Sequence, residues 1–328
     1  MRIAIIGAGA VGNLLAARLT AAQADVTLVA RAATAAQIRQ KGLLVVSPDN
    51  RVGHHEVRVT DDPVAAGPQD VIILCVKTYA LPGVLATMAS LCGPHTRVVP
   101  MINGIPWWYP HAQPAPLADR RMTSVDPDGT LSESLDAQRI VGACTYVAVE
   151  NDGPGRIRHI DGQRFVFGDP AGRPLPEIDA LADIFGKAGF QARATTDIRA
   201  EVWTKLLGNI WYNPTSVLTG ATLTTLCTDP GLREIGVAMM SEARAVAERL
   251  GVTFQEDIEQ RMQSAAAVGD FKTSMLQDYE AGRRLELPAI LGSVIELAEM
   301  AGVDTPTLRS VRALVSLRVR TRNAARAA

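Results

Sequence analysis

Cysteine, lysine and long apolar runs are all scarce in this chain of 328 residues. The four cysteines lie far apart without a C-x-x-C pair, which argues against a zinc site or a disulfide framework and favours reduced thiols in the cytoplasm. No run approaches the ~20 apolar residues that cross a membrane. A net charge of −1 gives no reason to expect a nucleic acid partner, and the five histidines show no metal-ligand spacing, so no metal is expected. With 47% hydrophobic residues, the chain is predicted to be globular.

Only five of the 33 basic residues are lysines. Arginine stays charged at any useful pH, whereas a desolvated lysine can release a proton, so a lysine within an apolar segment is a candidate for chemistry. Lys77 follows the apolar run "VIILCV", and Lys205 lies within "WTKLLGNIWYN". We expect the other three, Lys41, Lys187 and Lys272, to be solvated surface residues.

The N-terminal stretch "MRIAIIGAGAVGNLLAARLTAAQADVTLVAR" combines a strand, a G-x-G-x-x-G motif, a helical pattern and a second strand. This order is the dinucleotide-binding fingerprint: the glycines allow a tight turn, close approach of a pyrophosphate and close helix packing. The alternatives are a glycine-rich turn in an unrelated α/β fold and a secretory signal, which Arg18 interrupts. The predicted cofactor loop is Gly7, Ala8, Gly9, Ala10, Val11 and Gly12.

The second of these strands ends in Ala30 and Arg31. A site for NAD or FAD usually places Asp or Glu here to bind the ribose hydroxyls. Without that carboxylate, Arg31 can pair with a 2′-phosphate, so NADP(H) is the predicted cofactor. The alternative is that Arg31 is merely exposed.

Two further apolar stretches, "DVIILCVKTYAL" and "TRVVPMINGIPWWY", are predicted strands that end in Lys77 and in Asn103-Gly104. Ligands bind beyond the carboxyl ends of parallel strands, so Lys77 and Asn103 are expected near the cofactor; a solvated strand end and an ordinary turn are the alternatives. The aromatic run Trp107–Tyr109 could cap a substrate pocket or pack between domains. The segments "RIVGACTYVAVE", "GRIRHI" and "RFVFGD" are predicted to extend the same sheet.

Helical periodicity replaces the strand pattern from about Asp197. We therefore predict two domains, an α/β domain at 1–196 and an all-helical domain at 197–328, with helix ends at Gly251 and Gly302. The arginine-rich C-terminal run is expected to be a solvated final helix rather than a nucleic acid site.

Within "IRAEVWTKLLGNIWYN", polar residues recur every four positions and so share one face of the helix. This polar stripe either faces water or lines a wet pocket, because buried polar groups need partners. Asparagine is a mediocre helix former, which favours the pocket. The stripe consists of Glu201, Lys205, Asn209 and Asn213.

These motifs, together with "VKTY", "NP" at 213–214 and "TSMLQD" followed by Glu286, resemble the ketopantoate reductase (2-dehydropantoate 2-reductase) family over essentially the whole chain. The resemblance implies a Rossmann domain followed by a helical domain like the C-terminal part of 6-phosphogluconate dehydrogenase. It also implies NADPH-dependent reduction of ketopantoate to pantoate, for pantothenate and coenzyme A synthesis. The partner is then a small 2-oxo acid; the oligomeric state is left open, with a homodimer as one alternative.

Carried over by position, the resemblance makes Lys205 the general acid and Glu286 the residue that orients the substrate hydroxyl. Asn209, Asn213 and Ser274 would bind the polar ends of the substrate, with Asn103 and Lys77 near the nicotinamide and ribose. The chain departs from the family pattern at Leu287-Pro288, Phe271 and the aromatic run. A paralogue reducing another branched 2-oxo acid or an imine, and a non-catalytic NADP-binding sensor, are the competing hypotheses.

Overall fold

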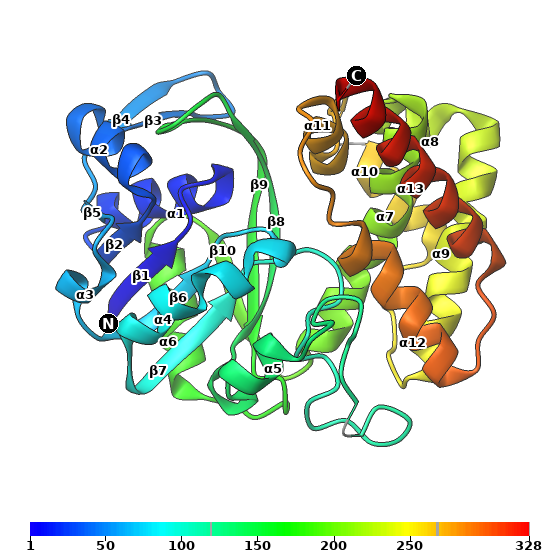
Figure 1. The fold of residues 1–328 in the computed structure, drawn as a ribbon, viewed down its shortest axis with the longest axis horizontal. Helices are drawn as coiled ribbons and strands as arrows, with labels where there is room; N and C mark the ends of the chain where they lie inside the picture. The colour runs from blue at the N-terminus through cyan, green and yellow to red at the C-terminus, as the bar shows by residue number, and fades with distance from the viewer. Residues whose placement is uncertain (119, 267–268, 328) are drawn as a thin grey trace. The chain divides into compact units, whose positions relative to one another are not determined.

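The computed structural model describes residues 1–118, 120–266 and 269–327. Its internal contacts divide the chain into two compact units, coloured along the chain in Figure 1. Unit 1 comprises Met1–Ile102 and Thr130–Ile198, and unit 2 comprises Asn103–Gly129 and Arg199–Ala328. The sequence-based boundary at residue 196 lies close to the last of these junctions but does not anticipate that 103–129 groups with the helices.

Unit 1 contains a parallel sheet in the strand order β5-β2-β1-β6-β7. Its strands are β1 (Arg2–Ile6), β2 (Asp25–Val29), β5 (Val59–Thr60), β6 (Gln69–Leu74) and β7 (Cys92–Pro100). The helices of this half are α1 (Ala10–Ala21), α2 (Ala32–Lys41), α3 (Pro63–Ala66) and α4 (Leu85–Leu91), with 3-10 turns η1 (Thr78–Ala80) and η2 (Pro82–Val84). Alternation of parallel strands and helices confirms the predicted Rossmann-type α/β fold.

A second sheet in unit 1 has the order β10-β9-β3-β4, with β8 paired to β9. Its strands are β3 (Leu43–Val46), β4 (Val52–His55), β8 (Gly142–Asn151), β9 (Arg156–Gly168) and β10 (Gln191–Thr195). The prediction that the segments at 139–168 extend the first sheet is therefore wrong. The motifs "GRIRHI" and "RFVFGD" form one strand, β9, which pairs in parallel with β3 and β10.

The physical reason for the second sheet is α1, which is buried almost all round. Leu14, Leu15 and Leu19 are 0% exposed, and α1 contacts β1 and β2 as well as β3, β8 and β9. A helix with no polar face needs apolar cover on every side. The later strands supply that cover instead of lengthening the parallel sheet.

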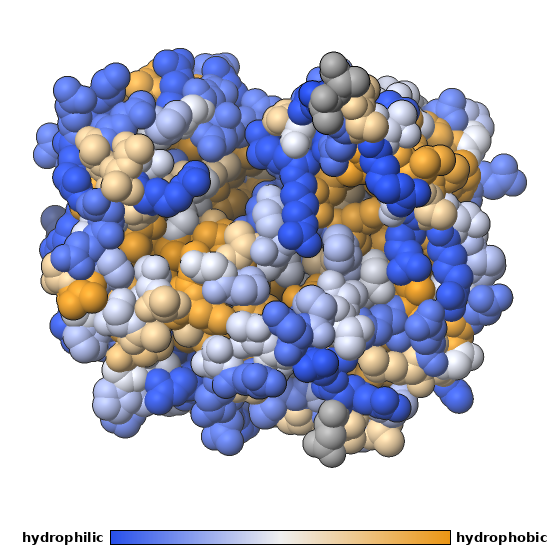
Figure 2. Space-filling view, viewed as in Figure 1, coloured by the Kyte–Doolittle hydropathy of each residue, from blue (hydrophilic) through white to orange (hydrophobic). Residues whose placement is uncertain are grey.

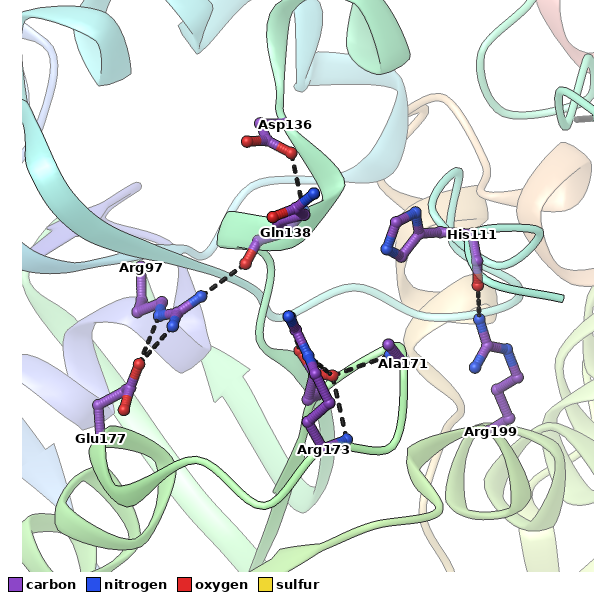
Figure 3. Close-up of polar contacts among 9 residues, drawn as sticks. Arg97, His111, Asp136, Gln138, Ala171, Arg173, Glu177 and Arg199 are labelled. Carbon is purple, nitrogen blue, oxygen red and sulfur yellow. Dashed lines mark hydrogen bonds and ion pairs between the residues drawn. The ribbon is translucent and has the colours of Figure 1, made fainter.

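The remaining elements of unit 1 complete this second layer. They are α5 (Thr130–Ser134), the 3-10 turn η3 (Ala137–Arg139) and α6 (Pro176–Lys187). Figure 3 shows Arg97 of β7 paired with Glu177 of α6, and Arg97 Nη1 also donates to the carbonyl oxygen of Gln138 (2.5 Å). The guanidinium therefore fixes α6 and the η3 turn to β7.

The regular elements among the described residues of unit 2 are all helices, as predicted for 197–328. They are α7 (Ile198–Thr219), α8 (Leu223–Thr228), α9 (Pro230–Arg249), α10 (Ile258–Ala266), α11 (Ser274–Glu280), the π-helix η4 (Pro288–Gly292), α12 (Ser293–Ala301) and α13 (Pro306–Ala327). Gly302 ends α12 in the left-handed conformation (φ 68°), and Gly251 (φ 84°) follows the end of α9. Both predicted helix ends are confirmed.

The core of unit 2 is built around α7. Trp203, Ile210 and Trp211 are 0% exposed, and a Cβ on Gly236 of α9 would lie 2.4 Å from the Trp211 ring. Only glycine lets α9 approach α7 this closely. The helix that carries the polar stripe is thus held rigidly by its apolar faces.

The C-terminal helix α13 is attached at both of its ends. Glu242 of α9 accepts from the backbone N–H groups of Thr307 and Leu308, and Arg322 donates to the carbonyl oxygen of Tyr279 at 2.6 Å. Figure 2 shows hydrophilic side chains interspersed with hydrophobic ones over the region where Figure 1 places α13, and Leu314 and Leu317 of this helix are exposed. Within the part of the chain that the structure describes, no helix has the length and apolar character needed to span a bilayer.

Candidate functional site

The predicted cofactor loop joins β1 to α1. Gly7 has φ 113°, where a Cβ would lie 2.7 Å from the carbonyl oxygen of Cys75. A Cβ on Gly12 would lie 1.9 Å from the carbonyl oxygen of Gly7. Gly9 is the N-cap of α1, with no side-chain cap and no acidic residue in the first turn. Residues 7–11 are partly exposed between a buried strand and a buried helix, so the N–H groups of the first helical turn are suited to an anion.

Asn13 supports this loop from below, and the sequence analysis did not single it out. Its side chain is 0% exposed and donates through Nδ2 to the carbonyl oxygen of Ala8 at 3.2 Å. The sequence signal for this role was an asparagine directly after G-x-G-x-x-G, at a position where the helix is buried, because a buried amide needs hydrogen-bond partners.

Arg31 lies at the same edge of the sheet as the loop. The carbonyl oxygen of Val29 accepts from Gly7 N at 3.0 Å, and Arg31 follows two residues later as the N-cap of α2. The side chain is exposed, and the first turn of α2 holds no acidic residue. No local carboxylate therefore competes for this guanidinium at the start of α2.

Lys77 reaches the same edge from β6. The strand ends at Leu74, three residues earlier than the predicted end, and Cys75 N donates to the carbonyl oxygen of Ile6 at 2.9 Å. Lys77 is half-buried and is the N-cap of η1. Burial raises the pKa of the neighbouring Cys75 thiol to about 12, so this cysteine stays protonated and is no nucleophile.

β7 ends at Pro100, three residues before Asn103, where the strand was predicted to end. Asn103 belongs to unit 2, where its Oδ1 accepts a hydrogen bond from Lys205 Nζ at 2.9 Å. Both side chains are half-buried. The structure thus joins the predicted proton donor to the amide that the sequence placed near the cofactor.

The rest of the polar stripe follows Lys205 along α7. Glu201 and Asn209 are half-buried, and Asn213 is 5% exposed. Among the described residues, the side-chain amides of Asn209 and Asn213 make no hydrogen bond to another side chain or to the backbone. Polar groups at this depth are expected to have a partner, which a bound polar molecule would supply.

Glu286 is buried, with 6% of its surface exposed. Its carbonyl oxygen accepts from Ile290 N at 3.1 Å, and the carbonyl oxygen of Ala289 accepts from Ile105 N at 2.9 Å. The same Ala289 oxygen would lie 2.0 Å from a Cβ on Gly104. The segment that carries Glu286 is therefore in backbone contact with the segment that carries Asn103.

Ser274 is exposed at the first position of α11. The residue before it, Thr273, is buried and caps the helix by accepting from Leu276 N at 3.1 Å. Ser216 Oγ donates to the carbonyl oxygen of Asn213 (2.8 Å) and lies 2.6 Å from Thr273 Oγ1, so the Thr273 hydroxyl donates to Ser216. This chain of hydroxyls fixes Ser274 relative to Asn213. A threonine directly before a helical pattern is a typical N-cap signal, so the position of Thr273 could have been predicted from the sequence.

The aromatic run Trp107–Tyr109 is buried and packs on α7. Trp203 Nε1 donates to Tyr109 Oη at 2.6 Å, with the rings edge to face. Arg199 donates to the carbonyl oxygens of Tyr109 and His111; Figure 3 shows the second contact. These contacts are packing within unit 2, which differs from the packing between domains that the sequence left open.

The structure shows the surroundings of two residues that depart from the family pattern. Pro288 is the first residue of η4, a position where a missing N–H costs nothing. The carbonyl oxygen of Phe271 accepts from Leu223 N at 3.0 Å, which ties the segment before α11 to α8.

Comparison with known proteins decides the family. The family model "Ketopantoate reductase PanE/ApbA" matches residues 3–172, and its C-terminal counterpart matches residues 197–319. The chain belongs to the ketopantoate reductase PanE/ApbA family. This ketopantoate reductase family member is therefore an oxidoreductase.

Named relatives cover nearly the whole of this family member. A 2-dehydropantoate 2-reductase from Mesorhizobium japonicum is 43% identical over 96% of this chain and 97% of its own. The crystal structure of a candidate ketopantoate reductase from Ralstonia solanacearum superposes with a TM-score of 0.91 at 39% identity, covering 98% of both chains. A 2-dehydropantoate 2-reductase from Geobacter metallireducens gives 0.85 at 26% identity, covering 97% of this chain and 99% of that one.

Proposed function

We propose that this protein reduces ketopantoate to pantoate with NADPH, for pantothenate and coenzyme A synthesis. The single observation that supports it best is the 2.9 Å hydrogen bond from Lys205 Nζ to Asn103 Oδ1. The bond directs the Lys205 amine toward Asn103, whose segment is in backbone contact with the segment of buried Glu286. The 43% identical relative named 2-dehydropantoate 2-reductase supports ketopantoate as the substrate.

The residues at the carboxyl edge of the parallel sheet fit a dinucleotide. Side chains at Gly7 and Gly12 would collide with backbone, and the uncapped N-terminus of α1 offers N–H groups to a pyrophosphate. Ala8, Ala10 and Val11 complete this loop, with Lys77 close by. The bound nicotinamide supplies the hydride.

The reaction needs a proton for the carbonyl oxygen while its carbon gains a hydride. The new bonds are C–H and O–H, and the cofactor is oxidised. We assign the proton to Lys205, since an ammonium group also stabilises the developing alkoxide. Asn103 Oδ1 accepts one of the ammonium hydrogens and so directs the amine. Glu286 orients the hydroxyl group of the substrate. Asn209, Asn213 and Ser274 bind the polar ends of the substrate.

Purified protein is expected to oxidise NADPH in the presence of ketopantoate, at a higher kcat/KM than with other 2-oxo acids. The measurement is the absorbance of reduced nicotinamide against a panel of branched and unbranched 2-oxo acids and cyclic imines. Preference for a different oxo acid identifies a paralogue, and NADPH binding without any turnover favours the sensor.

Free cysteines at positions 75, 92, 144 and 227 support a reducing compartment such as the cytoplasm. The homodimer stays a prediction.

Arg31→Ala is expected to raise KM for NADPH about 10- to 100-fold and to leave KM for NADH unchanged. Hydrogen bonds to charged groups contribute about 1.5–3 kcal/mol, and the 2′-phosphate distinguishes the two cofactors. Arg58→Ala is the matched control, because that exposed arginine pairs with Asp25 at the start of β2, the end of the strand opposite to Arg31. Equal increases in KM for NADPH and NADH would show that Arg31 does not bind the 2′-phosphate.

A further inference from the structure

Residues 103–129, here called the strap, form no helix or strand among their described members. Long segments of this kind in a compact unit are uncommon and are ordered only where specific contacts offset their conformational entropy. The strap nevertheless buries several large apolar side chains. They are Ile105, Trp107, Trp108, Tyr109, Leu117 and Met122.

The far end of the strap is bound by one carboxylate, that of Glu296 on α12. Glu296 Oε1 accepts from Thr123 N (2.6 Å) and Thr123 Oγ1 (2.7 Å). Glu296 Oε2 accepts from Ser124 N (2.9 Å) and Ser124 Oγ (2.5 Å). An ionised carboxylate is an acceptor with about four lone-pair sites, so two residues occupy its full capacity. Charge-assisted bonds of this kind are among the stronger ones in proteins.

The near end of the strap is bound to the same run of helix. Ala289 accepts the Ile105 N–H and leaves no room for a Cβ on Gly104. Ala289 lies in η4 and Glu296 in α12, seven residues apart, which is about 10 Å along a helix. Glu286 lies two residues before η4, and its carbonyl oxygen accepts from Ile290 N of η4. The continuous run of η4 and α12 therefore binds both ends of the strap and follows directly on Glu286.

We propose that Glu296 is a positioning residue for the Asn103–Lys205 pair. By closing the far end of the strap onto α12, it limits the movement of the near end, where Asn103 meets Lys205. The inference rests on the proposed function, in which Lys205 donates the proton. Glu296 itself touches neither substrate nor cofactor in this assignment.

Glu296→Gln is the sharpest variant, because it keeps the shape and turns one acceptor oxygen into an NH₂ group that faces donors. We expect kcat with ketopantoate to fall about tenfold, since small misplacements of catalytic groups are costly, while KM for NADPH stays unchanged. Glu299→Gln, on the same helix and at an exposed ion pair with Arg309, is the matched control and should match the wild type. Wild-type kcat in Glu296→Gln, or a change confined to KM, would overturn the proposal.

A double-mutant cycle separates positioning from general destabilisation. If Glu296 acts through Asn103, adding Glu296→Gln to Asn103→Ala lowers kcat no further. An equal fold-loss in both backgrounds overturns the proposal. Thr123→Val with Ser124→Ala removes the side-chain donors and offers a second route should Glu296→Gln not fold.

Amide hydrogen exchange tests the same coupling without substrate. In Glu296→Gln we expect faster exchange at Thr123 and Ser124 and also at Ile105, relative to Glu299→Gln. Faster exchange at 123–124 alone overturns the coupling. If the wild type reduced no oxo acid, the proposed function would fail, yet this measurement would still decide whether Glu296 restrains the near end of the strap.

Discussion

Replacing Lys205 by alanine is expected to lower kcat by about 10²- to 10⁴-fold, the range that a positioned general acid contributes. NADPH affinity should stay near that of the wild type, because the glycine loop belongs to unit 1 and Lys205 to unit 2. Steady-state kinetics with ketopantoate and isothermal titration with NADPH measure the two effects separately.

Lys205→Arg separates charge from proton transfer. Arginine keeps the positive charge but releases a proton far less readily, so kcat should remain low. Lys187→Ala, an exposed lysine on α6, is the control and should behave as the wild type. Unchanged turnover in Lys205→Ala would refute the assigned mechanism.

The second large effect is expected at Gly12. In Gly12→Ala the new Cβ would lie 1.9 Å from the carbonyl oxygen of Gly7, and neither backbone segment can move without lifting α1 from β1. We expect the free energy of unfolding to fall by about 2–4 kcal/mol, as for other backbone collisions in a core, and NADPH binding to fall more than 100-fold. Urea unfolding and NADPH titration provide the measurements.

Gly9→Ala is the matched comparison within the same loop. A Cβ there meets only the Cys75 carbonyl oxygen at 3.9 Å, and the backbone has φ −82°. The variant should therefore unfold like the wild type yet bind NADPH weakly, because the Cβ occupies the space that the pyrophosphate approaches. Normal NADPH affinity in Gly9→Ala would count against the loop as the phosphate site.

Local patterns were sufficient for two elements that matter most to the site. The glycine spacing after Ile3–Ile6 predicted the β1–α1 turn, because the positive φ of Gly7 and the close approach of Gly12 to the Gly7 carbonyl oxygen are local features. The four-residue recurrence from Glu201 to Asn213 predicted one face of α7, since helical geometry alone aligns those positions. The family resemblance, not the spacing, supplied their chemical roles.

Pairing between distant segments was not predictable in the same way. β3 pairs with β9, for example at Leu44 and Arg156. Nothing in the local sequence "LLVV" indicates which strand it pairs with. The burial of Glu286 was likewise not predictable, because nothing in its own surroundings, "GRRLELP", indicates a buried residue. Glu296 was overlooked for the same reason, because its hydrogen-bond donors are more than 170 residues away in sequence.

That separation has a consequence for synthesis of the protein. Ser124 leaves the ribosome 172 residues before Glu296, which at about 5–20 residues per second is about 10–30 s. Until then, Thr123 and Ser124 lack the carboxylate that binds them, although α7 is already available to the aromatic run. We expect this far end of the strap to stay unattached in the nascent chain until α12 emerges, which makes it a natural target for a chaperone during translation.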